Sequence, residues 1–216
     1  MIDQTCLTAV GPVDAYLRET CPIVPAPVDS GPIAALIEPG HRYVVAKDGI
    51  YLEVEREWLS ARFRIGAVAS MLEYGAVAPQ LQLKCGTVPQ RLLDRFLADA
   101  RAHAPLETAA WFVWNSEAGS SEEAWEYWPL KERYAAHDAV SVELPMLTGG
   151  RYRVVDIHSH GHWPAGFSSK DDSDDLLTRE TKLCIVFGEV NKARPSVAAR
   201  LCACGQSLPL EGIHVR

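Results

Sequence analysis

The sequence has no apolar stretch long enough to cross a membrane. A transmembrane helix needs about 20 consecutive, mostly apolar residues, and every such run here is interrupted well before that length. Basic residues are also missing at the N-terminus, which begins MIDQTC and so has an acidic residue where a secretory signal carries positive charge. We therefore expect a cytoplasmic protein with no membrane partner.

Clusters of lysine and arginine are absent as well. The chain has 21 Lys and Arg against 28 Asp and Glu, which gives a net charge of -7 at pH 7. Proteins that bind nucleic acid usually present a concentrated basic patch to the phosphates. The charge balance therefore argues against nucleic acid as a partner.

Cysteine is sparse, with six residues of which only Cys202 and Cys204 are close in sequence. So thin a spread is not a disulfide framework and is typical of reduced thiols in the cytoplasm. The Cys202-Ala-Cys204 pair leaves two interpretations open, namely a metal-binding pair or a short C-terminal strand or turn.

The remaining composition is that of an ordinary globular protein. Of 216 residues, 48% are hydrophobic and 23% are charged, so the chain can bury a sizeable core without a metal. The composition changes near Gly86, and we expect a small β-rich module over 1–85 and a larger domain over 86–216. Two roles remain open for this module, namely docking a partner and covering one edge of the sheet. Its predicted elements are a helix at 13–19, a hairpin of 43–46 and 50–54 around Lys47-Asp48-Gly49, and a strand after Trp58.

The larger domain has the pattern of a mixed α/β fold. Its apolar residues recur at helical spacing over 88–103 and form short buried or alternating runs further on. The predicted elements are helices at 88–103 and 171–179 and strands at 107–115, 124–130, 140–144, 151–157 and 183–190. This order predicts a mixed sheet flanked by helices.

The residues that carry chemistry are concentrated in Asp156–Asp175, DIHSHGHWPAGFSSKDDSDD. Side chains alternate faces along a strand, so we expect His158 and His160 to point to one side of a strand end and Ser159 to the other. A Gly/Pro loop follows and leads to Asp171. Two imidazoles and one carboxylate are ligands that Zn²⁺ favours, and they leave a fourth tetrahedral position open for water.

This spacing resembles the signature of the JAMM (MPN-plus) metalloproteases. Seven residues separate His160 from Ser168 and two separate Ser168 from Asp171, which gives His-Ser-His-x7-Ser-x2-Asp. The resemblance implies a layered α/β domain similar to the cytidine deaminases, with a catalytic zinc held by His158, His160 and Asp171. It also implies that Ser168 donates a hydrogen bond to the oxyanion and that an upstream glutamate acts as general base.

The resemblance assigns the general base to Glu107. The family places this glutamate at the start of a strand that follows a helix, often just after a proline, and HAPLE at 103–107 has that setting. A surface glutamate at a strand start is the alternative interpretation. Other candidates lie in or beyond the polar loop that follows: Glu117, Glu122, Glu123 and Glu126.

Two positions depart from the family pattern. Most JAMM peptidases have proline directly after the second histidine, where this chain has Gly161. Many also have glycine three residues after the glutamate, where this chain has Ala110. Both positions are expected to shape the cleft, so the departures bear on substrate fit more than on zinc binding.

His162 extends the motif to His-x-His-x-His, a pattern that also begins the sites of amidohydrolases, PHP enzymes and metallo-β-lactamases. Those folds need further ligands over a long following stretch, and only 56 residues (216 minus 160) follow His160. Cytidine-type deaminases need His-x-Glu and Pro-Cys-x-x-Cys, and the sequence has neither. His162 is thus either an extra zinc ligand or a loop histidine lining the cleft.

The aspartates that follow the motif predict a solvated helix start: Asp172, Asp174 and Asp175.

The motif and its surroundings also resemble protein A of the plasmid-associated PRTRC system, a JAMM-domain family. HSHG, the later FS and the DDSDD run carry this resemblance, which covers residues 88–190. It implies a bacterial system with ubiquitin-like, E1-like and E2-like proteins, and an isopeptidase or processing peptidase that cleaves at a ubiquitin-like C-terminus. The competing interpretation is a non-enzymatic module that docks a ubiquitin-like partner and has a structural or vestigial zinc site.

Overall fold

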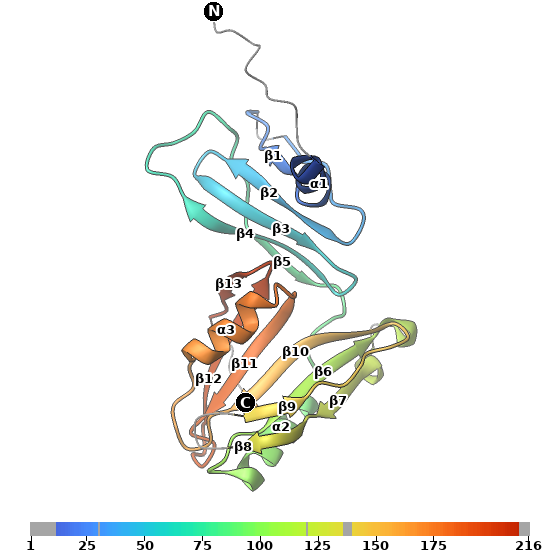
Figure 1. Ribbon diagram of the computed structural model, residues 1–216, viewed down its shortest axis with the longest axis vertical. Helices are drawn as coiled ribbons and strands as arrows, with labels where there is room; N and C mark the ends of the chain where they lie inside the picture. Colours follow the sequence, from blue (N-terminus) through green and yellow to red (C-terminus); the bar gives the residue numbers. More distant parts are fainter. Residues whose placement is uncertain (1–11, 30, 120, 136–139, 212–216) are drawn as a thin grey trace, which may run out of the picture. The chain divides into compact units, whose positions relative to one another are not determined.

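The structure is a computed structural model that describes residues 12–29, 31–119, 121–135 and 140–211, so that Cys6 lies outside the described part. The chain divides into two compact units, Met1–Lys84 and Cys85–Arg216 (Figure 1). Within the described ranges, no helix has both the length and the apolar character that crossing a membrane requires.

The first unit is a five-stranded sheet with one helix, and it confirms the predicted β-rich character. The strand order is β1-β2-β3-β4-β5. The predicted helix, hairpin and following strand are all present, whereas β5 is short and exposed and leaves no clear signal in the sequence. The elements are α1 (Pro12–Thr20), β1 (Ile23–Pro25), β2 (Gly40–Ala46), β3 (Gly49–Glu55), β4 (Leu59–Ala67) and β5 (Gln80–Leu83).

The second unit is a six-stranded mixed sheet, which confirms the predicted α/β class. Its order is β13-β12-β11-β10-β6-β7, and β10 pairs with β11 in parallel while the other neighbours are antiparallel. The helices are α2 (Gln90–His103) and α3 (Ser169–Leu177). The strands are β6 (Ala109–Asn115), β7 (Trp125–Pro129), β10 (Arg151–Ser159), β11 (Lys182–Gly188), β12 (Ser196–Ala203) and β13 (Gln206–Pro209).

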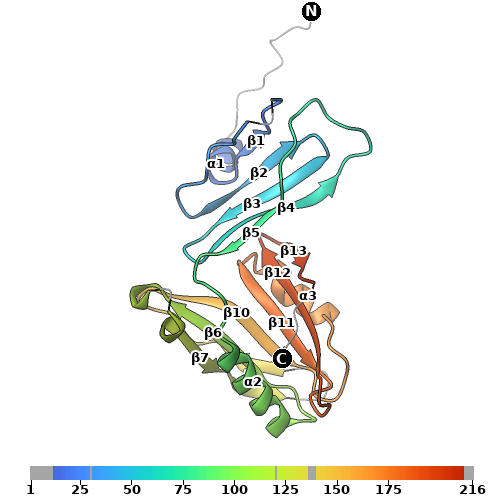
Figure 2. The ribbon, with the colours of Figure 1, turned by 180° about the vertical axis from the view of Figure 1, so that it is seen from behind.

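The two faces of this sheet differ in chemistry, and α2 and α3 cover opposite faces (Figures 1 and 2). Under α2 the face is apolar: the ring centroids of Phe96 on α2 and Phe187 on β11 are 5.8 Å apart. On the α3 side the register aligns polar residues, because Asp156 on β10 is paired with Cys184, which is in turn paired with Arg200 on β12. The hydrophobic core therefore lies mainly under α2, and the other face is available for chemistry.

The predicted strand at 140–144 is present as β9 (Val140–Glu143), but it does not join the main sheet. It pairs with β8 (Lys131–Ala135) in a separate two-stranded sheet. The flanking residues Leu130 and Leu147 pack with Ala109, Trp111 and Val113 of β6. These apolar contacts hold the segment over β6, which explains why a strand-like pattern ends up outside the main sheet.

Candidate metal centre

The two motif histidines lie side by side where β10 ends. Their Nε2 atoms are 3.2 Å apart and their ring centroids are 5.1 Å apart. The backbone N–H of His160 donates to the carbonyl of Phe187 on β11, at 2.8 Å, so the strand direction continues just past Ser159. This continuation places His158 and His160 on one side, as strand alternation predicts.

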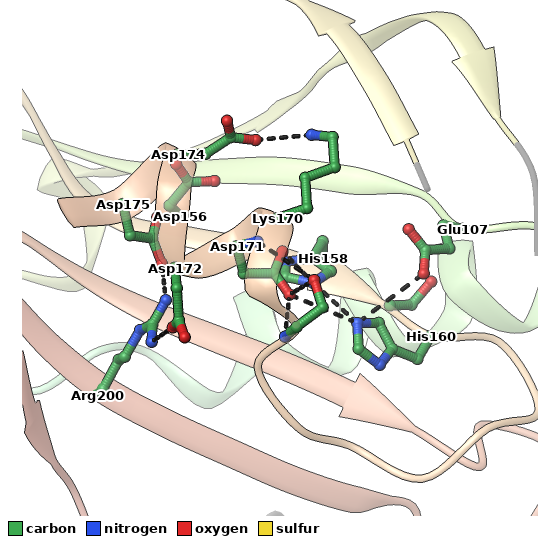
Figure 3. Close-up of polar contacts among 12 residues, drawn as sticks. Glu107, Asp156, His158, His160, Lys170, Asp171, Asp172, Asp174, Asp175 and Arg200 are labelled. Atoms are coloured by element: carbon green, nitrogen blue, oxygen red, sulfur yellow. Dashed lines mark hydrogen bonds and ion pairs between the residues drawn. The ribbon is translucent and has the colours of Figure 1, made fainter. Parts of the chain in front are cut away.

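Asp171 approaches the histidines from the first turn of α3. Its Oδ1 lies 3.4 Å from Nε2 of His158 and its Oδ2 lies 4.0 Å from Nε2 of His160. One ligand atom from each of the three residues fits within 4.8 Å of the others. The sequence-predicted ligands are therefore brought together from a strand end and a helix start (Figure 3).

Ser168 is the N-cap of α3 and fixes the Asp171 carboxylate. Oδ2 of Asp171 accepts hydrogen bonds from the backbone N–H and the hydroxyl of Ser168, both at 2.7 Å, while the N–H of Asp171 donates to Oγ at 3.2 Å. This is a complete capping box. Because Oδ2 is engaged in the cap, Oδ1 is the oxygen left to serve as metal ligand. The oxyanion role assigned to Ser168 stays a prediction.

Glu107 lies beside the histidine pair, with Oε1 at 3.9 Å from Nε2 of His160 and its side chain 6% exposed. Strand β6 begins at Ala109, two residues later than the sequence suggests. A reciprocal pair of hydrogen bonds fixes this segment: Ser159 N–H donates to the carbonyl of Thr108 at 3.0 Å, and Thr108 N–H donates to Oγ of Ser159 at 3.2 Å. Strand alternation predicts that Ser159 faces away from the ligands, but no local sequence pattern predicts these hydrogen bonds to Thr108.

The rival glutamates follow the other end of β6. Ala109, near Glu107, is paired with His158, whereas Asn115 is paired with Arg151 at the start of β10. Six residues along a strand correspond to roughly 20 Å at about 3.3 Å per residue. Glu126 pairs with Arg151 at 3.0 Å instead of approaching the histidines. Glu107 is therefore the glutamate that the fold places at the site.

Gly161 makes the turn that follows the ligands. Its φ is +53°, and a Cβ at this position would lie 2.4 Å from the carbonyl oxygen of Pro105. Proline cannot adopt this φ. A chain with proline directly after the second histidine must therefore follow a different backbone path at this position. Ala110, the second departure, is paired with Ile157 and is fully buried on the α2 face. It therefore does not line the metal-facing side, contrary to expectation.

The electrostatic setting favours a neutral ligand at His158. Burial lowers the pKa of His158 below its usual value, and the carboxylate of Asp171 opposes this shift only in part. A neutral imidazole is the form that binds a metal. Two imidazoles with one carboxylate fit Zn²⁺ in residue type, number and proximity.

A second group of metal-binding residue types lies under α3, formed by Asp175, Cys184 and Cys202. The two Sγ atoms are 3.6 Å apart. The carboxylate of Asp175, however, is already paired with Lys182 at 2.7 Å and with Arg200 at 2.6 Å. Two buried cations compensate its charge, so this group is an ion-pair cluster and not a metal site. The prediction that Asp175 is solvated is wrong, because Arg200 of β12 faces α3.

Two further candidates from the sequence are His162 and the Cys202-Ala-Cys204 pair. His162 is exposed on the turn after His160, and the groups of possible ligands among the described residues do not include it. Cys202 belongs to β12 and Cys204 to the turn before β13. The pair therefore forms a short strand and turn, which the sequence offered as the alternative to a metal-binding pair.

The larger unit matches a known family. Residues 89–201, more than half of the chain, match the family described as prokaryotic homologs of the JAB domain. The chain therefore belongs to this family, and the resemblance predicted from the motif is confirmed. Residues 11–84 match a second model, described as a domain of unknown function (DUF2016).

Other comparisons add little. No curated protein matches the chain. Among solved structures, the solution structure of protein DSY2949 from Desulfitobacterium hafniense is similar to this chain with 17% identity and a TM-score of 0.42, covering 57% of this chain and 88% of that one.

Proposed function

We propose that this protein is a zinc-dependent peptidase that hydrolyses an amide bond at or near the C-terminus of a ubiquitin-like protein. The observation that supports it most directly is that the ligand atoms of His158, His160 and Asp171 fit within 4.8 Å of one another and that Glu107 lies 3.9 Å from His160. Membership of the JAB family is consistent with this chemistry.

His158, His160 and Asp171 would hold the zinc, which when bound polarises a carbonyl group and makes water more acidic. Glu107 accepts the proton of the water whose oxygen attacks the carbonyl carbon. The same carboxyl group then gives that proton to the nitrogen as the C–N bond breaks, so the amine leaves neutral. Ser168 would present its hydroxyl to the oxyanion in place of its present hydrogen bond to Oδ2 of Asp171.

The substrate would bind as an extended strand beside the sheet, so that backbone hydrogen bonds supply part of the affinity. Such a tail is flexible before binding and can reach a site at a strand end. In the proposed setting the protein acts in the cytoplasm of a bacterium beside E1-like and E2-like proteins. The thin spread of the six cysteines along the chain supports a reducing compartment.

The decisive experiment follows cleavage of a fusion in which a ubiquitin-like protein is joined through its C-terminus to a reporter peptide. Glu107→Gln should lower kcat by about 10²-fold or more while keeping one zinc per chain, because the carboxylate is not among the ligands. Glu123→Gln, which removes an exposed glutamate beyond the far end of β6, is the matched control and should leave cleavage intact.

Two outcomes would overturn the proposal. Full activity in Glu107→Gln would remove the general base from the mechanism. A zinc-loaded wild-type protein that binds the ubiquitin-like protein but cleaves no fusion would instead establish the non-enzymatic docking module. A His160→Ala variant in the same series shows whether the zinc depends on the motif.

A further inference from the structure

We propose that Arg200 is a positioning residue that sets the metal affinity of the site by holding the start of α3, and with it Asp171, against the sheet. This inference deepens the proposed function, because it depends on the metal centre assigned there. Arg200 lies on β12, outside the sequence signature, and belongs to a strand that is otherwise almost wholly apolar or small: SVAARLCA.

Arg200 contacts the chain before and after the metal ligand Asp171. Its guanidinium pairs with Asp172 and, at 2.6 Å, with Asp175 one turn further along. The same group stacks over the ring of Phe167, 3.8 Å from the centroid. Phe167 precedes the N-cap Ser168, so a single buried side chain contacts the residue before the cap and the first two turns of the helix. Figure 3 shows Arg200 against Asp172 and Asp175.

Asp171 depends on this contact more than the histidines do. His158 and His160 come from the end of β10, whose position is fixed by hydrogen bonds to β6 and β11. Asp171 is the one ligand of the three that comes from another element, so its distance to the imidazoles varies with the docking of α3. Groups that orient metal ligands typically change metal affinity by about 10–100-fold when they are removed.

Charge explains why an arginine suits this position. Asp171, Asp172 and Asp175 carry like charges on the first two turns of α3 and repel one another. The planar guanidinium can engage two carboxylates and an aromatic face at once. Arg200 is only 6% exposed and Asp175 is also buried, so water screens this pair little, whereas the Asp172 side chain is 52% exposed and its pair is screened more. The arrangement fixes both the depth and the rotation of the helix start.

Lys182 provides a matched comparison. It is another buried cation bound to Asp175, at 2.7 Å, and it also binds Asp156 on β10 at 3.0 Å. Its ion pairs are with Asp156 and Asp175, and Asp172 is not among its partners. Replacing Lys182 therefore removes a buried charge from the same cluster without releasing the start of α3.

The experiment measures the zinc dissociation constant of the full chain by competition with a chromophoric chelator, for wild type, Arg200→Met and Lys182→Met. Thermal unfolding of the metal-free proteins measures separately how much each substitution destabilises the fold. Both variants should unfold at lower temperature. Arg200→Met should bind zinc about 10–100-fold more weakly, whereas Lys182→Met should bind zinc nearly as tightly as wild type.

A second pair of variants keeps the test valid if Arg200→Met does not fold. Asp172→Asn removes a half-exposed partner of Arg200, and Asp174→Asn removes an exposed carboxylate of the same helix that pairs with Lys170. Both lose one negative charge on α3, but only Asp172→Asn loosens the Arg200 contact. It should therefore show the weaker zinc binding of the two.

Equal zinc affinity in Arg200→Met and wild type, or equal weakening in Asp172→Asn and Asp174→Asn, would overturn the positioning role while leaving the metal centre in place. A wild-type protein that binds no zinc would overturn the proposed function itself. The two failures are therefore distinguishable in one set of measurements.

Discussion

The hydroxyl oxygen of Ser168 lies 2.7 Å from Oδ2 of Asp171 and accepts the backbone N–H of the same residue at 3.2 Å. A capping box requires a spacing of three residues, because the N-cap side chain reaches the N3 backbone. The Ser-x2-Asp spacing of the signature is therefore also a helix-start motif. In this protein one carboxylate closes the helix cap with one oxygen and is left with the other for a metal.

Ser168→Ala should weaken zinc binding as well as α3. Losing an N-cap costs about 1 kcal/mol, and the carboxylate of Asp171 would become free to rotate. We expect about a tenfold larger zinc dissociation constant, within the range for groups that orient ligands. The measurement is chelator competition together with thermal unfolding.

Ser169→Ala is the control for that change. It removes a neighbouring exposed hydroxyl from the same helix start but leaves the capping box intact. If both alanine variants bind zinc equally well, Ser168 does not orient Asp171.

Gly161→Ala should disturb the site through the backbone. A Cβ at position 161 would lie 2.4 Å from the carbonyl oxygen of Pro105, and its φ of +53° is unfavourable for alanine. We expect a loss of about 1–3 kcal/mol in the free energy of unfolding and weaker zinc binding, because the turn follows His160 directly. Gly166→Ala in the same loop, where a Cβ meets nothing within 4 Å, should have little effect on either measurement.

Removing the metal should leave the fold in place but lower its thermal stability. The buried core lies under α2 around Phe96, Phe112 and Phe187, and the ligands are not part of it. A chelated sample should keep its far-UV circular dichroism, and zinc at 100 times its dissociation constant should restore about 2.7 kcal/mol. His160→Ala should show no such dependence on zinc. Unfolding of wild type on chelation would contradict this view of the core.

Asp175 should make the stability of the protein sensitive to acid. Burial by itself raises the pKa of Asp175, but hydrogen bonds from Lys182 and Arg200 outweigh it, so the pKa lies below its ordinary value. A lowered pKa in the folded state stabilises the fold above the unfolded pKa of about 3.9. That contribution is lost as the pH falls through the folded pKa.

The test compares thermal unfolding of wild type and Asp175→Asn between pH 7 and pH 3. At pH 7 the variant should be less stable by about 2–4 kcal/mol, because Lys182 and Arg200 each lose a buried partner. The difference should stay constant down to about pH 5 and shrink below about pH 4. Asp174→Asn, which is exposed, should match wild type throughout. A stability difference between the two proteins that grows towards low pH would contradict a lowered pKa of Asp175 in the folded state.

The sequence alone predicted the candidate ligands that the structure brings together and most of the elements around them. His158 and His160 share a face because side chains alternate along a strand, and the spacing from Ser168 to Asp171 is a local helix-start motif. The α2 helix and strands β6, β7, β10 and β11 also follow from local apolar patterns. Such features depend on residues that are near one another in the chain, so they can be predicted from local sequence patterns.

The tertiary structure decided which distant residues meet at the site. Register between β6 and β10 selects Glu107 over the rival glutamates, and packing against β6 removes β9 from the main sheet. The pairing of Arg200 with Asp172 and Asp175 joins residues 28 and 25 positions apart. No local pattern contains such contacts, because they depend on which strands become neighbours and which face each helix covers.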